Sequence, residues 1–263
     1  MCGIAGYSLE AGSAVDRRLA AQALLAGIAE RGADAVGYAF RIPGDRVFVH
    51  KQRSGASDLL DHVDVPQVAT ELLVHVRDFT KGHPRIKANN HPVRHGSVLG
   101  IHNGIIFNDD EIMARHGFAR DTAEMTVDSE AIFALAESSR GRALALEELR
   151  GSMAAAWLDE RRPESVFLAR GVGRPVWIGR GRAETFFAST LAALELLERC
   201  AGLELDKREL DEGTLVMLER GRERRRERFR PDRRFEEAPL PAVRAPHEAH
   251  ACLQRLRALL SPG

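Results

Sequence analysis

Short apolar runs bounded by Gly, Pro, Asp or Asn dominate the chain and predict buried β-strands. The runs expected to form strands are 3–7, 36–40, 47–50, 72–76, 98–102, 154–158, 166–169, 176–179, 186–188 and 214–218. Apolar residues at helical spacing predict helices over 16–31, 128–139, 190–199 and 247–260. This mixture excludes a helical bundle, and the absence of a regular strand–helix alternation disfavours a doubly wound parallel sheet. Two stacked sheets flanked by helices fit the pattern.

Composition places the chain among folded soluble proteins. It has 263 residues, of which 44% are apolar and 29% charged. No run of eighteen apolar residues is present, and the N-terminus lacks the pattern of a secretory signal, so no membrane association is expected. The three cysteines are widely spaced and odd in number, which favours reduced thiols and a cytoplasmic location.

Charge changes the picture only near residue 220. Lys plus Arg and Asp plus Glu both number 38, yet residues 220–234 hold nine Arg against three acidic residues. We therefore predict one domain over 1–220, followed by an Arg/Pro-rich linker and a short C-terminal helix over 221–263. Phe229 is the only aromatic residue within the Arg run, so no nucleic-acid partner is expected.

Cys2, directly after the initiator Met, is the first candidate for chemistry. Met1 is normally removed when the next side chain is small, and Cys2 would then carry a free α-amine beside its thiol. Such an amine has a pKa of about 7.7–8.0, so it can accept the thiol proton near neutral pH. In an arbitrary protein a cysteine here is only a tolerated small residue. The motifs that follow decide between these interpretations.

Several separated motifs occur in a fixed order along the chain. The opening segment 1–6 (MCGIAG) resembles the start of class II glutamine amidotransferases, which are N-terminal-nucleophile hydrolases. The resemblance continues through the segments 31–37, 75–82, 90–92, 101–106, 127–130, 185–189 and 211–213. It covers about residues 1–220 and is strongest to the glutaminase domain of glucosamine-6-phosphate synthase. The resemblance implies an α+β fold, a four-layer αββα sandwich, with no cofactor and no metal.

The resemblance also implies the catalytic residues. Cys2 would be the nucleophile, and the oxyanion would be stabilised by the Asn103 side-chain amide and the Gly104 backbone N–H. Taken alone, an Asn-Gly pair is also a strong signal of a hairpin turn. The pair is therefore compatible with a source of oxyanion donors, with a hairpin turn, or with both.

Three residues match the positions that hold glutamine in the family. A guanidinium binds a carboxylate through two hydrogen bonds, so Arg77 is expected to hold the substrate α-carboxylate. Asp128 is expected to hold the α-ammonium, and Thr80 to contribute a hydroxyl. The simpler alternatives are an exposed surface pair for Arg77 and a helix N-cap for Asp128, with Ser129 as another candidate cap.

Arg31 and His102 are expected to support the site. Arg31 matches a family arginine near the nucleophile, although a basic residue at a helix C-terminus is a simpler explanation. His91 and His102 have no partner at a metal-ligand spacing, so both are predicted to be structural.

Two residues depart from the family pattern. Asp78 stands where an aromatic residue is usual, and Lys81 where a histidine is common. A carboxylate beside Arg77 would weaken its attraction for the substrate carboxylate. This raises the alternative of a different substrate.

The leading hypothesis is hydrolysis of the glutamine side-chain amide through a Cys2 thioester, supplying ammonia to a separate synthase subunit. One alternative is a stand-alone amidohydrolase for another γ-glutamyl amide. A further alternative, of a different class, is a non-catalytic glutamine-binding regulator. The intact set of Cys2, Arg77, Asn103, Gly104 and Asp128 argues against the regulator. The sequence leaves open whether the chain forms a homo-oligomer.

Overall fold

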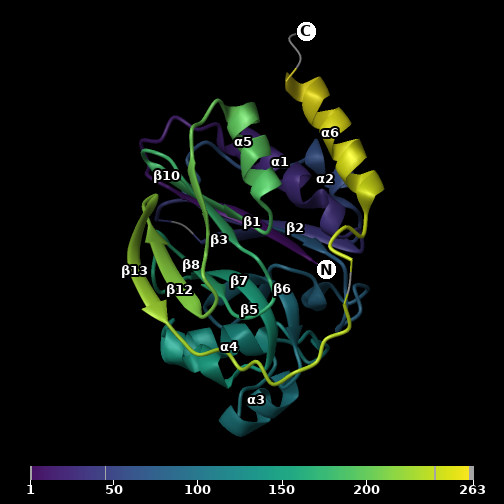
Figure 1. The fold of residues 1–263 in the computed structure, drawn as a ribbon, viewed down its shortest axis with the longest axis vertical. Coiled ribbons are helices and arrows are strands. Elements are labelled where there is room, and N and C mark those ends of the chain that lie inside the picture. The colour runs from purple at the N-terminus through teal and green to yellow at the C-terminus, as the bar shows by residue number, and fades with distance from the viewer. Residues whose placement is uncertain (1, 45, 240, 261–263) are drawn as a thin grey trace.

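Two antiparallel sheets form the centre of the molecule, as a computed structural model describes for residues 2–44, 46–239 and 241–260 (Figure 1). The first sheet has seven strands in the order β11-β9-β10-β1-β4-β2-β3. Its strands are β1 (Gly3–Leu9), β2 (Ala35–Arg41), β3 (Val47–Gln52), β4 (Glu71–Arg77), β9 (Trp177–Arg180), β10 (Glu184–Ala188) and β11 (Asp206–Glu209).

The second sheet has six strands in the order β13-β12-β8-β7-β6-β5. Its strands are β5 (Val93–His95), β6 (Val98–Ile106), β7 (Gly151–Asp159), β8 (Ser165–Arg170), β12 (Thr214–Glu219) and β13 (Arg222–Arg228). One apolar cluster, which includes Ile4, Ile101 and Phe187, lies between the two sheets.

Helices cover the outer faces of both sheets (Figure 1). Those on the seven-stranded sheet are α1 (Arg17–Ile28), α2 (Ala56–Leu60), α5 (Leu191–Ala201) and α6 (Pro246–Leu260). Those on the six-stranded sheet are α3 (Asp109–His116) and α4 (Glu130–Ser139). The described residues also include three short 3₁₀ helices, η1 (Ala29–Arg31), η2 (Lys87–Asn89) and η3 (Ala143–Glu148). Separate apolar clusters fill each helix–sheet interface. The predicted four-layer αββα sandwich is confirmed.

Strand β1 places Cys2 at the centre of the molecule. It pairs with β10 on one side and β4 on the other, and all its residues are buried. Gly6 makes this packing possible, because a Cβ there would lie 2.1 Å from the Leu72 carbonyl oxygen and 2.5 Å from the Phe187 ring. Helix α1 follows, and its N-cap Asp16 accepts a hydrogen bond from the Leu19 N–H.

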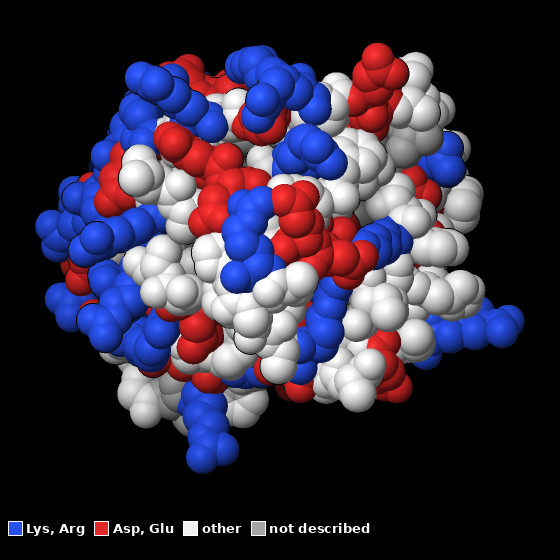
Figure 2. Space-filling view, turned by 90° about the horizontal axis from the view of Figure 1, so that it is seen from below, with Lys and Arg blue, Asp and Glu red and all other residues white. Residues whose placement is uncertain are grey.

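The prediction that the Arg-rich segment is a linker is wrong. Residues 222–228 form the edge strand β13, which pairs with β12 along its length. Its outer side chains are exposed arginines, and basic residues gather on the side of Figure 2 where β13 lies in Figure 1. An edge strand needs no apolar alternation, and charged side chains there oppose pairing with another sheet. The domain boundary near residue 220 stays a prediction.

The C-terminal helix predicted over 247–260 is present as α6, but not all of its apolar residues are buried. Cys252 and Leu256 are buried against the helical layer, whereas Leu259 and Leu260 are 50% and 44% exposed. Among the described residues, no helix combines the length and apolar character needed to cross a membrane.

Candidate active site

Cys2 lies directly before β1 and is held at both its thiol and its carbonyl. The thiol donates to the Asp78 carbonyl oxygen, with Sγ at 3.5 Å, and Arg31 Nε donates to the Cys2 carbonyl at 3.4 Å. Burial raises the pKa of the Cys2 thiol, whereas the Asp78 hydrogen bond and the nearby Arg77 charge lower it. Met1, whose removal is predicted, lies outside the described residues.

One pocket collects most of the predicted site. Its walls include Cys2, Arg77, Thr80, His102, Gly104 and Asp128. These residues come from the segment before β1, from β4 and β6, and from the loops after β4 and before α4. Arg31 contacts Cys2 as described above, and Asn103 directly precedes Gly104. Segments far apart in the sequence therefore converge at Cys2.

Asn103 and Gly104 lie inside β6 and not in a turn, so the hairpin interpretation is wrong. They pair with Ala154 and Met153 of β7. Gly104 has φ +146°, and a Cβ there would lie 2.0 Å from the Ser152 carbonyl oxygen. Only glycine fits this conformation and this close approach.

The Asn103 side chain is fully buried, yet neither its amide nitrogen nor its oxygen has a hydrogen-bond partner among the described residues. Buried amides are normally paired, because an unpaired one loses its hydrogen bonds to water without replacement. An unpaired buried amide beside the pocket is a group available to a ligand or a reacting atom.

Arg77 is buried at 2% exposure, so the alternative of an exposed surface pair is wrong. Its guanidinium donates to the Asn90 side-chain oxygen and to two loop carbonyls, those of Lys81, at 2.9 Å, and Gly82. Among the described residues no carboxylate is within ion-pair distance of it, and burial lowers its pKa. A buried cation paired only with neutral carbonyls remains strongly attractive to an anion.

Asp128 does not cap α4, contrary to one predicted alternative. Its carboxylate accepts a hydrogen bond from the Ile106 N–H at 2.8 Å, and Ser129 takes the N-cap position without a side-chain capping bond. Asp128 is buried at the pocket wall, and this burial raises its pKa to about 6.

The loop after β4 closes over the pocket and is tied down at two points. Lys81 Nζ lies 2.7 Å from both carboxylate oxygens of Asp109, at the start of α3, and 2.9 Å from Asp110. The Phe79 N–H donates to the Asp34 carboxylate at 2.9 Å. Thr80, between these ties, is exposed at the pocket rim. The unusual Lys81 therefore fastens the loop.

Three buried histidines contact one another at the pocket, and two of them, His91 and His102, line it. His102 Nδ1 bonds the Ser129 hydroxyl at 2.9 Å, and His75 Nε2 bonds the His102 carbonyl at 3.1 Å. Burial lowers the pKa of His75 and of His102 to about 3, so both stay neutral. His91 stacks on His75 with ring centroids 4.1 Å apart, and its ring nitrogens have no partner in the described chain. Sequence reasoning missed His75, whose inward direction follows only from its place on the central β4.

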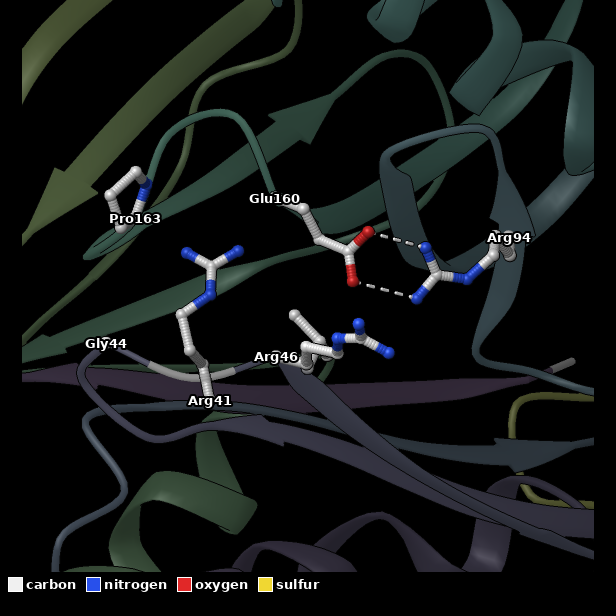
Figure 3. A pocket seen from close by; sticks show the side chains of 7 residues that line it. Arg41, Gly44, Arg46, Arg94, Glu160 and Pro163 are labelled. Atoms are coloured by element: carbon white, nitrogen blue, oxygen red, sulfur yellow. Dashed lines mark hydrogen bonds and ion pairs between the residues drawn. The ribbon is translucent and has the colours of Figure 1, made fainter.

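A larger cavity of about 670 Å³ lies elsewhere, between the β2–β3 connection and the loop after β7 (Figure 3). The charged side chains Arg41, Arg94 and Glu160 of this cavity already have hydrogen-bond partners within the protein. Arg94 binds Glu160 through two hydrogen bonds of 2.8 and 3.1 Å, and the buried Arg41 donates to the Asp159 and Arg162 carbonyls. None of its lining residues is a nucleophile. The pocket at Cys2 is the better candidate for chemistry.

Comparison with curated proteins finds similarity to one group of enzymes. A family model described as a glutamine amidotransferase domain matches residues 83–196. Glutamine–fructose-6-phosphate aminotransferase of Vibrio vulnificus is 31% identical over 78% of this chain, and that of Photorhabdus laumondii is 32% identical over 78%. The chain spans about a third of the length of these relatives, 34% in each case.

Solved structures with the same fold include the glutamine phosphoribosylpyrophosphate amidotransferase from B. subtilis. It superposes with a TM-score of 0.68 at 19% identity, covering 86% of this chain and 49% of that one. At this identity the likeness establishes the fold. Taken with the family match and the aminotransferase relatives, it shows that the chain contains a class II glutamine amidotransferase domain.

Proposed function

We propose that this domain hydrolyses the side-chain amide of glutamine to glutamate and ammonia, with Cys2 as nucleophile. The observation that carries the proposal is that Cys2 and the positive-φ Gly104 line one pocket, and that the buried amide of Asn103, next to Gly104, has no hydrogen-bond partner among the described residues. A binding protein needs neither a nucleophile nor unpaired donors beside it. Amide hydrolysis uses all three.

The reaction begins when the Cys2 α-amine, freed by removal of Met1, takes the thiol proton. The thiolate attacks the amide carbon, and the Asn103 amide and Gly104 N–H donate to the oxyanion. Collapse breaks the C–N bond, and the proton held by the α-amine passes to the leaving nitrogen, so ammonia and a glutamyl thioester form. Water, deprotonated by the same amine, then attacks the thioester and releases glutamate and the Cys2 thiol.

Recognition of glutamine is assigned to the charged groups of the same pocket. Arg77 supplies the cation for the α-carboxylate, Asp128 the anion for the α-ammonium and Thr80 a hydroxyl at the rim. The volume open to water in the pocket is only about 10 Å³, roughly what one water needs. Glutamine binding therefore requires the loop 78–82 to move.

The raised pKa of Asp128 predicts how binding depends on pH. Because the folded-state pKa is about 6, the carboxylate is charged above that pH and progressively neutral below it. We expect the Kd for glutamine, measured by calorimetry on Cys2→Ala protein, to be constant above pH 7. Below pH 6 it should rise about tenfold per pH unit.

Asp128→Asn in the same Cys2→Ala background provides the control. This variant should bind glutamine weakly at every pH, with no dependence between pH 5 and 7. A wild-type-like Kd for it, or a flat profile in the parent, would remove Asp128 from substrate recognition.

The proposed fate of the ammonia is transfer to a separate synthase subunit. The relatives named above are aminotransferases, of which this chain matches about a third. The test is whether a co-purifying enzyme is recovered with the full chain and lost when residues 220–263 are removed, after the truncated protein is shown to fold. Recovery of no synthase in either case would favour release of ammonia to solvent.

The substrate itself is tested by incubating the protein with glutamine alone and with other γ-glutamyl amides. We expect glutamate and ammonia to form from glutamine in equal amounts. Turnover of another amide with glutamine inert would establish the alternative, a stand-alone amidohydrolase. Asp78, the residue that raised this alternative, is paired with Arg244 at 3.1 Å.

A further inference from the structure

The C-terminal segment passes directly beside the nucleophile. Arg244, just before α6, places Nε 3.1 Å from the Asp78 carboxylate. The N–H groups of Arg244 and Ala245 both donate to the Glu30 carbonyl, at 2.8 and 2.9 Å. Figure 1 shows the segment before α6, in yellow, running close to the N-terminal end of the chain.

Both contacts adjoin the groups that hold Cys2. The Asp78 backbone carbonyl accepts the Cys2 thiol hydrogen bond, and Glu30 is followed by Arg31, which donates to the Cys2 carbonyl. Residues 244–245 thus bridge the two segments between which the nucleophile is fixed. We propose that Arg244 and Asp78 are positioning residues, and that the C-terminal segment acts as a clamp that holds Cys2 for reaction.

Helix α6 gives this clamp a rigid base. Cys252 and Leu256 are buried in the cluster beneath the helix, at 0% and 2% exposure. The Glu248 carboxylate accepts the Ser57 N–H at 2.8 Å, near the start of α2, and Gly55 leaves room for it. Because these contacts anchor the helix, the position of Arg244 at its start is defined.

The clamp also explains the residue that departs from the family pattern. The Asp78 side chain is 16% exposed and directed to Arg244, which neutralises it. We expected Asp78 to compete with the substrate for Arg77. Its carboxylate is instead paired with Arg244 from the C-terminal segment. An aromatic residue at this position could not form that ion pair.

This inference rests on the proposed glutaminase activity only for its kinetic readout, the change in kcat. Arg244→Ala and Asp78→Asn are each expected to lower kcat for glutamine about tenfold, with KM changed less than about twofold, because a displaced nucleophile slows chemistry more than binding. The double variant should be no slower than either single one, since both remove the same contact. Arg244→Lys, which keeps the charge, should recover at least half of kcat.

Arg255→Ala is the matched control. Arg255, on α6, forms an ion pair with Asp61 at 2.5 Å, and neither residue lines the pocket at Cys2. This variant should keep wild-type kcat, and all variants should melt within about 2 °C of the wild type, as expected for partly exposed ion pairs.

Hydrogen–deuterium exchange supplies a readout that does not need activity. Arg244→Ala should speed exchange about threefold or more in peptides covering 28–34 and 77–83, and Arg255→Ala should not. If the wild type is inactive but exchange responds as stated, the proposed function fails and the clamp stands. Unchanged kcat and unchanged exchange in Arg244→Ala would overturn the clamp.

Discussion

We expect Cys2→Ala protein to release no measurable glutamate from glutamine, a loss of at least about 10⁴-fold in kcat. The reason is that Cys2 carries the only thiol among the described residues that line the pocket, and the hydroxyls of Thr80 and Ser129 are far weaker nucleophiles. The measurement is glutamate formation at saturating glutamine, with Tm as a check on folding. The substitution removes only a small, partly buried side chain at a strand end, so Tm should stay within about 2 °C.

Cys200→Ala is the control for thiol chemistry elsewhere. Cys200 is also reduced and partly buried, but it lies on α5, outside the pocket. It should retain full activity. Residual turnover in Cys2→Ala above one hundredth of the wild-type rate would place the nucleophile at another residue.

Asn103→Ala should lower kcat by about 10²- to 10³-fold, the loss typical of one oxyanion donor. It should do so without lowering the free energy of unfolding. The Asn103 amide has no partner in the described chain, so its removal breaks no hydrogen bond and leaves no new unpaired group. Urea unfolding and steady-state kinetics on the same preparation measure both quantities.

Asn89→Ala is the structural counterpart. The Asn89 side chain is equally buried, but its oxygen accepts the Thr126 and Val127 N–H groups at 2.8 and 3.1 Å. Its loss should lower the free energy of unfolding by about 2–4 kcal/mol, since two buried N–H groups lose their partner. If Asn103→Ala instead resembles Asn89→Ala, with stability lost and kcat retained, Asn103 is structural.

Much of the fold follows from the alternation of apolar runs and turn residues. The runs at 72–76 and 98–102 became β4 and β6, because each contains more apolar surface than an exposed loop can carry. The strands that were not predicted, β5, β11 and β13, all lie at sheet edges. Their stability comes from backbone pairing with a neighbour, which side-chain periodicity does not report.

The candidate site was accessible from sequence only through the order of its motifs. Periodicity could not distinguish Asn103-Gly104 in a strand from a turn, because an Asn-Gly pair is typical of hairpin turns and the φ of +146° at Gly104 leaves no mark in the apolar pattern. Nor could any local signal join Asp78 to Arg244, since the ion pair depends on the path of the C-terminal segment across the molecule. The role of a residue that depends on contacts between segments far apart in the sequence could be assigned only from the three-dimensional structure.

The most direct test of the account is peptide mass spectrometry of wild-type protein mixed with glutamine and quenched in acid within one turnover. The proposed mechanism predicts an N-terminal peptide that begins at Cys2 and carries a glutamyl group bound to Cys2 as a thioester. This glutamyl group should be absent when glutamine is omitted. An N-terminal peptide that retains Met1 in active protein, or a glutamyl group on any residue other than Cys2, would contradict it.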